Sequence, residues 1–219
     1  MTYKSTHPID KLHFITNQWS TIPIKNQVAS FLSAGGKWVQ LRLKDLTDTE
    51  INDIAIMVQD LCKTHGATFI INDRVDLALQ TNADGVHLGK EDLSPTEARK
   101  LLGNGKIIGT TANSRGDLER ALSLPVDYIG LGPYRFTTTK QKLAAPMGHD
   151  GFSQHAKWMQ QQVNPLPMVG IGGIRPDDIG VICASGLHGV ALSSCISHAQ
   201  NGADITQQLI QALKNNSTC

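Results

Sequence analysis

The sequence has no excess of charge of either sign and few charged residues altogether. Its 219 residues include 20 Lys and Arg against 19 Asp and Glu, which gives a formal net charge of +1. Nucleic acids and anionic membrane surfaces select clustered basic residues, so this balance argues against both as partners. With 40% hydrophobic residues, the chain also lacks the composition of a disordered protein. We therefore expect a folded chain whose anionic ligands are small molecules.

Cysteines and long apolar runs are equally scarce. The four cysteines form no C-x-x-C pair, which argues against a disulfide framework or a zinc cage, so we expect reduced thiols. No run approaches the roughly 18 apolar residues of a membrane span, and the first ten residues lack the apolar centre of a secretory signal. These absences predict a cytoplasmic protein. Since no linker or low-complexity stretch divides the chain, we predict one domain over residues 1–219, with its core at 11–213.

Eight short runs of apolar and β-branched residues alternate with segments of helical pattern. One such segment, residues 49–64, places its apolar residues on a single helical face, and Ser94 followed by Pro95 and Glu97 is typical of a helix start. The pattern predicts an α/β fold, a single-domain (β/α)8 TIM barrel, with an open doubly wound sheet as the alternative. The expected strands are residues 12–16, 38–44, 68–73, 85–89, 106–111, 128–133, 168–173 and 189–194.

Basic and amide side chains alternate along the second expected strand. Gln40, Arg42 and Lys44 share one side of it, because successive side chains of a strand point to opposite faces. In a barrel that side is the interior, where two unpaired cations are costly to bury. We therefore predict that they bind an anionic ligand; the alternative is a solvated edge.

Two carboxylates follow the next two strands. Asp73 ends the third strand, and Asp92 follows the fourth. Carboxylates from adjacent strand ends can share Mg²⁺, which typically takes one or two of them together with phosphate oxygens. We therefore predict a site for Mg²⁺ and a diphosphate. The alternative is that Asp73 caps a turn and Asp92 is a solvated loop residue.

The sixth, seventh and eighth strands end in residues suited to phosphate. The sixth runs into a hydroxyl-rich loop that ends at Lys140, and the interval to the seventh strand is the longest between strands, which suggests a functional loop. The seventh ends Gly170-Ile171-Gly172-Gly173 and the eighth ends Ser193-Ser194. Loops after strands 7 and 8 commonly bind phosphate in TIM barrels. Two anion sites, and hence two phosphorylated substrates, are predicted; His87, within the fourth strand, is interpreted as structural.

Taken together, these segments resemble thiamine-phosphate synthases. The resemblance runs in family order across about residues 12–196. The matching segments are VQLRLKD (39–45), FIINDRVDLAL (69–79), ADGVHLGKEDL (83–93), IIGTT (107–111), DYIGLGPYRFTTTK (127–140), VGIGGI (169–174) and GVALSS (189–194).

The resemblance implies transfer of a hydroxymethylpyrimidine group from its diphosphate to the nitrogen of a thiazole phosphate, giving thiamine phosphate and pyrophosphate. It implies a dissociative mechanism with Mg²⁺ as cofactor, in which Arg42, Lys44 and Lys140 stabilise the leaving diphosphate. The implied pyrimidine diphosphate contacts are Gln40, Arg42, Lys44, Asn72, Thr111 and Lys140, and the implied metal ligands are Asp73 and Asp92. The implied thiazole phosphate contacts are Thr137, Thr138, Thr139, Gly173, Ser193 and Ser194.

The chain departs from the family pattern in a few places. Thr111 stands where the family has Ser, Leu43 stands where it often has Glu, and Tyr134-Arg135-Phe136 replace the usual residues of the sixth-strand loop. Two rival functions are considered: a thiazole tautomerase-like isomerase, which needs neither Mg²⁺ nor diphosphate, and a non-catalytic thiazole phosphate-binding protein. The tautomerase-like branch is expected to use a His near the start of the sixth-strand loop, where Pro133 and Tyr134 stand here. The sequence leaves a homo-oligomer open.

Overall fold

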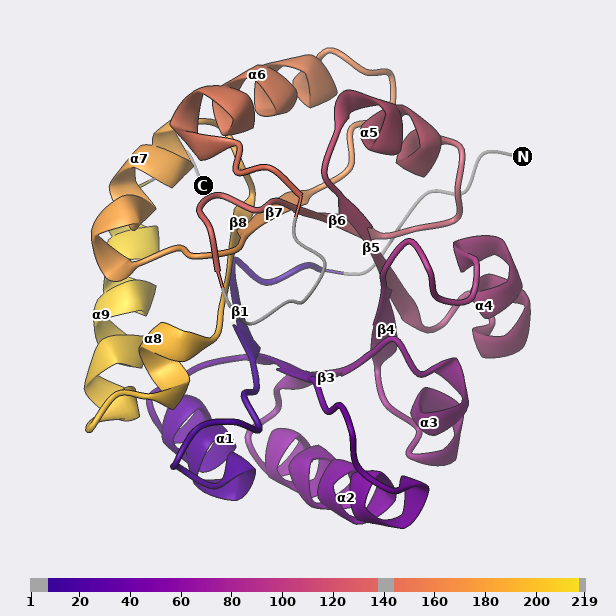
Figure 1. Cartoon of the computed structure of the whole chain (residues 1–219), viewed down its shortest axis with the longest axis vertical. Helices are drawn as coiled ribbons and strands as arrows, with labels where there is room; N and C mark the ends of the chain where they lie inside the picture. Colours follow the sequence, from indigo (N-terminus) through magenta and orange to yellow (C-terminus); the bar gives the residue numbers. More distant parts are fainter. Residues whose placement is uncertain (1–7, 138–143, 217–219) are drawn as a thin grey trace.

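The computed structural model describes residues 8–137 and 144–216, and eight parallel strands close into a barrel (Figure 1). Each strand pairs with the next along the chain, and the last pairs with the first through Leu12 and Val190. This closure confirms the predicted TIM barrel over the open-sheet alternative. The strands are β1 (Leu12–Ile15), β2 (Trp38–Leu41), β3 (Thr68–Asn72), β4 (Gly85–Leu88), β5 (Ile107–Ala112), β6 (Tyr128–Leu131), β7 (Met168–Ile171) and β8 (Gly189–Leu192).

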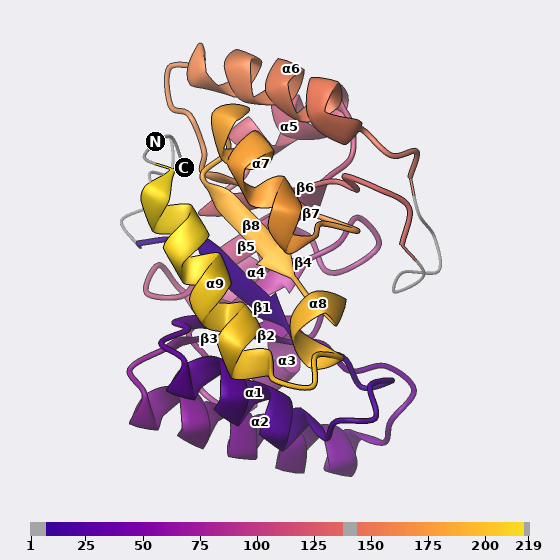
Figure 2. The same cartoon turned by 90° about the vertical axis from the view of Figure 1, so that its left-hand side faces the viewer.

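Helices surround the barrel on all sides (Figures 1 and 2). The predicted helix start at Ser94 is confirmed, because its side chain accepts a hydrogen bond from the backbone N–H of Glu97. Thr47 and Ser114 cap α2 and α5 in the same way, each accepting from the backbone N–H three residues on. The helices are α1 (Ile24–Ser33), α2 (Asp48–Thr64), α3 (Val75–Gln80), α4 (Pro95–Leu102), α5 (Arg115–Leu122), α6 (Gly148–Gln160), the 3₁₀ turn η1 (Pro176–Asp178), α7 (Ile179–Ala184), α8 (Ser194–Ser197) and α9 (Gly202–Asn215). None of the described helices is long and apolar enough to span a membrane.

The apolar core has two shells, which follow from the alternation of side chains along each strand. The outer shell lies between strands and helices and includes Val39 and Leu41 of β2. The inner shell fills the barrel and includes Trp38 of the same strand, with Ile70 and Tyr128. Towards the carboxyl ends of the strands the interior becomes polar, and Gln40 is buried there. The fold therefore directs polar side chains to one mouth of the barrel.

The structure corrects two expectations. Several strands end earlier than predicted, and β2 ends at Leu41 rather than Lys44, so Arg42 and Lys44 lie in the loop that follows. The expectation of reduced cysteines is wrong for Cys183, which is disulfide-bonded, whereas Cys62 and Cys195 are free thiols. Disulfide pairing depends on which residues the fold brings together, and spacing along the chain does not reveal this.

Candidate functional site at the carboxyl ends of the strands

A buried pair of amides marks the start of the site. Gln40 of β2 is 3% exposed, and its Nε2 donates a hydrogen bond of 2.8 Å to Oδ1 of Asn72 at the end of β3. The register of the two strands, in which Leu41 lies opposite Ile71, brings these side chains together. The structure thus unites two of the residues predicted to bind the pyrimidine diphosphate, with polar groups held in fixed positions.

Arg42 follows directly after β2 and is half-buried. Its guanidinium carbon lies 5.5 Å from the ring centroid of Trp19, a cation–π contact with the loop after β1. Burial lowers the pKa of Arg42 from its ordinary value, and the negative charge of Asp73 partly opposes that effect. Among the described residues no side chain accepts a hydrogen bond from this guanidinium, so an anion at the barrel mouth would find a fork of donors there.

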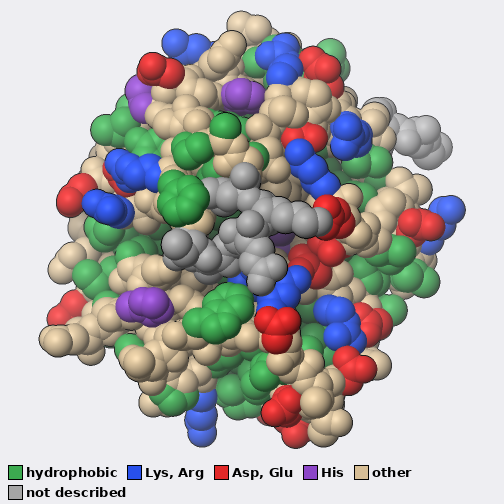
Figure 3. Space-filling model, in the orientation of Figure 1, with side chains coloured by type: hydrophobic (Ala, Val, Ile, Leu, Met, Phe, Trp, Pro, Cys, Tyr) green, Lys and Arg blue, Asp and Glu red, His purple; other side chains and the backbone are tan. Residues whose placement is uncertain are grey.

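The two predicted metal ligands meet beside Lys44. Lys44 Nζ forms an ion pair with Asp73, and Asp92 accepts a hydrogen bond of 2.6 Å from the backbone N–H of Gly89. Asp73 has a φ of 66°, a left-handed conformation that few residues other than Gly, Asn and Asp adopt. Figure 3 shows basic and acidic side chains gathered next to each other near the centre of this face.

The two carboxyl groups have opposite pKa shifts because their surroundings differ. Burial by itself raises the pKa of Asp73, but hydrogen bonds with Lys44 and Asp92 outweigh it, so the pKa is lowered. Burial and then the neighbouring Asp73 raise the pKa of Asp92. Two carboxyl groups this close repel each other when both are ionised, and a divalent cation between them would relieve that repulsion.

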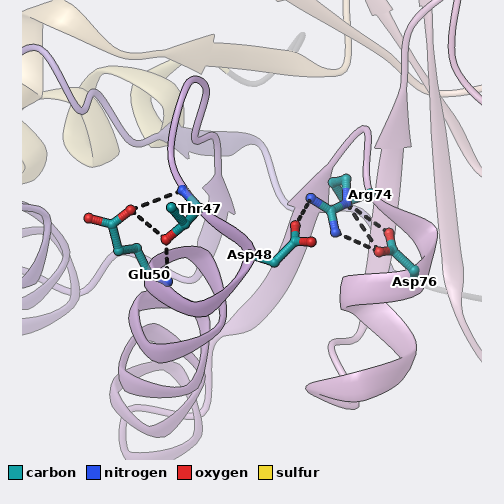
Figure 4. Close-up of polar contacts among 5 residues, drawn as sticks. All are labelled: Thr47, Asp48, Glu50, Arg74 and Asp76. Carbon is teal, nitrogen blue, oxygen red and sulfur yellow. Dashed lines mark hydrogen bonds and ion pairs between the residues drawn. The ribbon is translucent and has the colours of Figure 1, made fainter.

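Arg74 fixes the loop that carries Asp73. Its guanidinium donates to Asp76, with one bond of 2.6 Å, and to Asp48 at 3.1 Å, so it ties the start of α3 to the start of α2 (Figure 4). Figure 4 also shows the capping box of α2, in which Thr47 and Glu50 bond each other. Asp73 is thereby presented from a loop anchored to two helices.

A polar network inside the barrel reaches the predicted contact Thr111. His87 of β4 lies 3.0 Å from Thr111 Oγ1 through Nε2 and 3.0 Å from the Tyr128 hydroxyl through Nδ1. Both ring nitrogens are therefore partnered, in agreement with a structural histidine. A Cβ at Gly109 would lie 2.2 Å from the Tyr128 ring, so this glycine is needed for the ring to enter the barrel. The sequence did not predict that His87 forms a hydrogen bond with Thr111, one of the predicted substrate contacts.

The described members of the predicted thiazole phosphate set follow β6, β7 and β8, across the barrel from β2 and β3. Ser193 precedes α8, and its buried Oγ has no hydrogen-bond partner among residues 8–137 and 144–216. Ser194 is the exposed first residue of α8, Gly173 follows β7, and Thr137 is half-buried after β6. Thr138, Thr139 and Lys140 lie outside the described residues.

The glycines after β7 make room for the loop after β6. A Cβ at Gly173 would lie 2.8 Å from Arg135 Cβ and 3.0 Å from Phe136 O, and Gly173 has a φ of 66°. Arg135 forms an ion pair with Asp178 of η1, whose other carboxylate oxygen accepts a bond of 2.6 Å. Asp178 also accepts from the backbone N–H of Arg175 at 2.8 Å. The ion pair between Arg135 and Asp178, here called the clasp, thus joins the loop after β6 to the segment after β7, the two regions predicted to bind phosphate. No sequence motif predicted this contact.

The donor set fits Mg²⁺. Asp73 and Asp92 offer two hard oxygen ligands. In the described part of the chain no group of three or more His, Cys, Asp or Glu residues could hold a metal, so a metal ion here would have two carboxylate ligands from the protein. Two carboxylates leave most of an octahedral shell to water and phosphate oxygens, as is usual for Mg²⁺. A cavity of about 370 Å³ reaches Lys44, Asp73 and Asp92.

A closed β/α barrel defines the class, a TIM-barrel protein. Its charged and amide side chains collect at the carboxyl ends of the strands, where TIM barrels usually carry their active sites, so this is the candidate site. The chain belongs to the thiamine monophosphate synthase family, whose model matches residues 12–196.

Individual relatives agree over nearly the whole chain. It is 42% identical over 200 residues to thiamine-phosphate synthase of Phocaeicola vulgatus, covering 91% of this chain and 96% of the relative. It is 40% identical over 210 residues to thiamine-phosphate synthase of Flavobacterium johnsoniae, covering 94% and 98%. Thiamine phosphate pyrophosphorylase from Pyrococcus furiosus superposes with a TM-score of 0.84 at 28% identity, covering 94% of this chain and 96% of that chain.

Proposed function

We propose that this protein joins hydroxymethylpyrimidine diphosphate to thiazole phosphate, giving thiamine phosphate and pyrophosphate. The observation that carries this proposal is the meeting of Arg42, Lys44, Asp73 and Asp92 at one mouth of the barrel, next to the buried Gln40–Asn72 pair. Cations and carboxylates together suit a metal-bound diphosphate, whereas a simple phosphate site needs no carboxylates. The family relationship supports the same reaction.

The chain's own residues would stabilise the leaving group. In a dissociative reaction the C–O bond to the diphosphate breaks first, and the electron-rich aminopyrimidine stabilises the resulting carbocation. Arg42 and Lys44 would then neutralise the charge that develops on the departing diphosphate, and Lys140 would add a third cation. When bound by Asp73 and Asp92, Mg²⁺ would supply further Lewis-acid stabilisation of phosphate oxygens. Thr111, Gln40 and Asn72 would orient the pyrimidine diphosphate.

The second substrate would bind on the opposite side of the mouth. The unpartnered Oγ of Ser193 supports a phosphate contact there, because a buried hydroxyl without a partner is costly. Ser194, Gly173 and Thr137 to Thr139 complete the proposed set. The thiazole nitrogen would thereby face the pyrimidine carbocation, and the two bound phosphates would remain at separate ends of the site.

The rival functions explain less of this arrangement. A tautomerase-like isomerase or a thiazole phosphate-binding protein has no use for the carboxylate pair and the cations after β2. The discriminating experiment mixes the protein with both substrates and Mg²⁺ and measures pyrophosphate. We expect pyrophosphate and thiamine phosphate in equal amounts, with neither formed when one substrate is omitted. Thiazole phosphate binding without pyrophosphate release would favour the binding protein.

The Arg135–Asp178 clasp gives a first prediction within this function. Asp178→Asn removes the charge that Arg135 binds, so the loop after β6 is held less firmly against β7. We expect KM for thiazole phosphate to rise about fivefold, in keeping with a partly exposed ion pair. Its exposed neighbour Asp177 provides the matched control, Asp177→Asn, which is expected to leave KM unchanged. An equal rise in KM in both variants would show that the Arg135–Asp178 ion pair is not the cause.

The same clasp predicts a pH dependence. Hydrogen bonds from Arg135 lower the pKa of Asp178 below its ordinary value. The stabilisation is therefore present above the pKa of the unfolded chain and is lost as pH falls through the lowered pKa of the folded protein. The KM difference between the wild type and Asp178→Asn is expected to shrink below about pH 4, which steady-state kinetics over a pH series would show.

A further inference from the structure

We infer that the segment after β1 aims the diphosphate-binding cations, with Thr16 and Gln18 as positioning residues for Arg42 and Lys44. The inference rests on the proposed function and concerns residues that no motif singled out. Since β2 ends at Leu41, no strand pairing holds Arg42 and Lys44 in the extended conformation that alternation requires. Something else must direct both side chains to the mouth of the barrel.

Thr16 replaces strand pairing at Arg42. The backbone N–H of Thr16 still donates to Gln40 O at 3.0 Å, which is the last rung of the ladder. Beyond it the hydroxyl of Thr16 accepts from the backbone N–H of Arg42 at 3.0 Å and donates to the Arg42 carbonyl at 3.4 Å. Thr16 is 1% exposed, so these bonds are shielded from water. One side chain thus satisfies both backbone groups of Arg42.

Gln18 repeats the arrangement two residues further on. Its Nε2 donates to the Lys44 carbonyl at 2.6 Å, and its Oε1 accepts from the Lys44 backbone N–H. The amide therefore pairs with Lys44 as a neighbouring strand would. Thr16 and Gln18 are two residues apart, as are their partners Arg42 and Lys44. The side chains of Thr16 and Gln18 therefore extend the β1–β2 pairing after both strands have ended.

The side-chain directions agree with this extension. Leu43 packs against the outer shell of the core, while Arg42 lies over Trp19 and Lys44 reaches Asp73. The alternation that the sequence predicts therefore continues through residues 42–44. Long cationic side chains lose less entropy on binding an anion when their backbone is already fixed, and pre-organised donors are what a developing charge requires.

The segment is itself anchored to two helices. Gln27 of α1 donates to the Asn17 carbonyl at 2.8 Å and accepts from the Asn17 N–H at 3.1 Å. Asn17 Nδ2 lies 3.0 Å from His198 Nε2, and Ser20 Oγ donates to Ser197 O at 2.6 Å, which joins the segment to α8. A support fixed in this way can transmit its geometry to Arg42 and Lys44.

The test replaces Gln18 by alanine and measures the binding of Mg²⁺-pyrophosphate by calorimetry, together with steady-state kinetics. We expect the Kd for pyrophosphate and the KM for the pyrimidine diphosphate each to rise about tenfold, from the loss of two hydrogen bonds. The KM for thiazole phosphate and the melting temperature should stay near wild type. The control is Gln162→Ala, because Gln162 also donates to a backbone carbonyl, that of Trp158 at 2.8 Å, but lies before β7 at the opposite end of the barrel.

Thr16 provides an independent pair of variants. Thr16→Ser keeps the hydroxyl and is expected to bind pyrophosphate like the wild type, whereas the isosteric Thr16→Val is expected to bind it about tenfold more weakly. Unchanged pyrophosphate affinity in Gln18→Ala would overturn the inference, as would an equal loss for thiazole phosphate. A wild-type protein that binds pyrophosphate but releases none from its two substrates would contradict the proposed function alone, and the binding comparison would still decide the role of Gln18.

Discussion

Arg42→Ala is expected to lower kcat about 100- to 1000-fold, the range seen when one donor to a developing charge is removed from an active site. Arg42 is half-buried at the barrel mouth, where its charge is screened less than at the surface. Its guanidinium is held over Trp19 and has no hydrogen-bond acceptor among the described side chains. The loss should fall mainly on kcat, because the charge on the diphosphate grows as the C–O bond breaks.

Single-turnover kinetics with both substrates bound would measure this loss directly. Arg42→Lys keeps the charge but not the planar fork of donors, so it is expected to fall between the wild type and Arg42→Ala. Arg120→Ala, which removes an arginine from the surface of α5 with a 66% exposed side chain, is the control and should turn over normally. If Arg42→Ala altered only the melting temperature, Arg42 would have a structural role.

Asp73→Asn is the second large change, with an expected loss of about 100-fold at limiting Mg²⁺. Asparagine has nearly the same shape but no charge, so it weakens the proposed metal site and removes the partner of Lys44. The wild-type carboxyl has a lowered pKa from its hydrogen bonds with Lys44 and Asp92, despite burial, and is ionised at neutral pH. At neutral pH, protonation of Asp73 therefore does not compete with metal binding.

The measurement is a Mg²⁺ titration of activity, with direct binding of Mn²⁺ as a readout that does not depend on turnover. The variant should reach half of its own maximal rate only at a Mg²⁺ concentration at least about tenfold higher than the wild type needs. Asp60→Asn, at an exposed position on α2, is the control. Wild-type activity that survives complete removal of divalent cations would rule out Asp73 and Asp92 as ligands of a required metal.

The barrel and much of the candidate site follow from local patterns. Strand positions follow from short β-branched runs, and helix starts follow from residues such as Ser94 with Pro95, whose capping chemistry acts within one turn. The interior position of Gln40 follows from the two-residue period of a strand. The meeting of Gln40 with Asn72 follows once adjacent strands are assumed to end together.

Contacts between loops could not be predicted in this way. The alternating pattern continues past Leu41, where backbone pairing has already stopped, so the sequence alone predicts a later end for β2 than the structure shows. Gln18 lies 26 residues from Lys44, and Arg135 lies 43 residues from Asp178, so no period or spacing connects them. The disulfide at Cys183 was missed for the same reason.

The sequence by itself determined the barrel, the edge at which polar side chains collect, and the family to which the chain belongs, because these depend on periodicity and on motifs within single segments. Only the tertiary structure decided how those side chains are held: the hydrogen bonds of Thr16 and Gln18, the opposite pKa shifts of Asp73 and Asp92, and the clasp from Arg135 to Asp178. Such contacts depend on distances of a few ångströms between loops, which the folded barrel fixes and the order of residues does not encode locally.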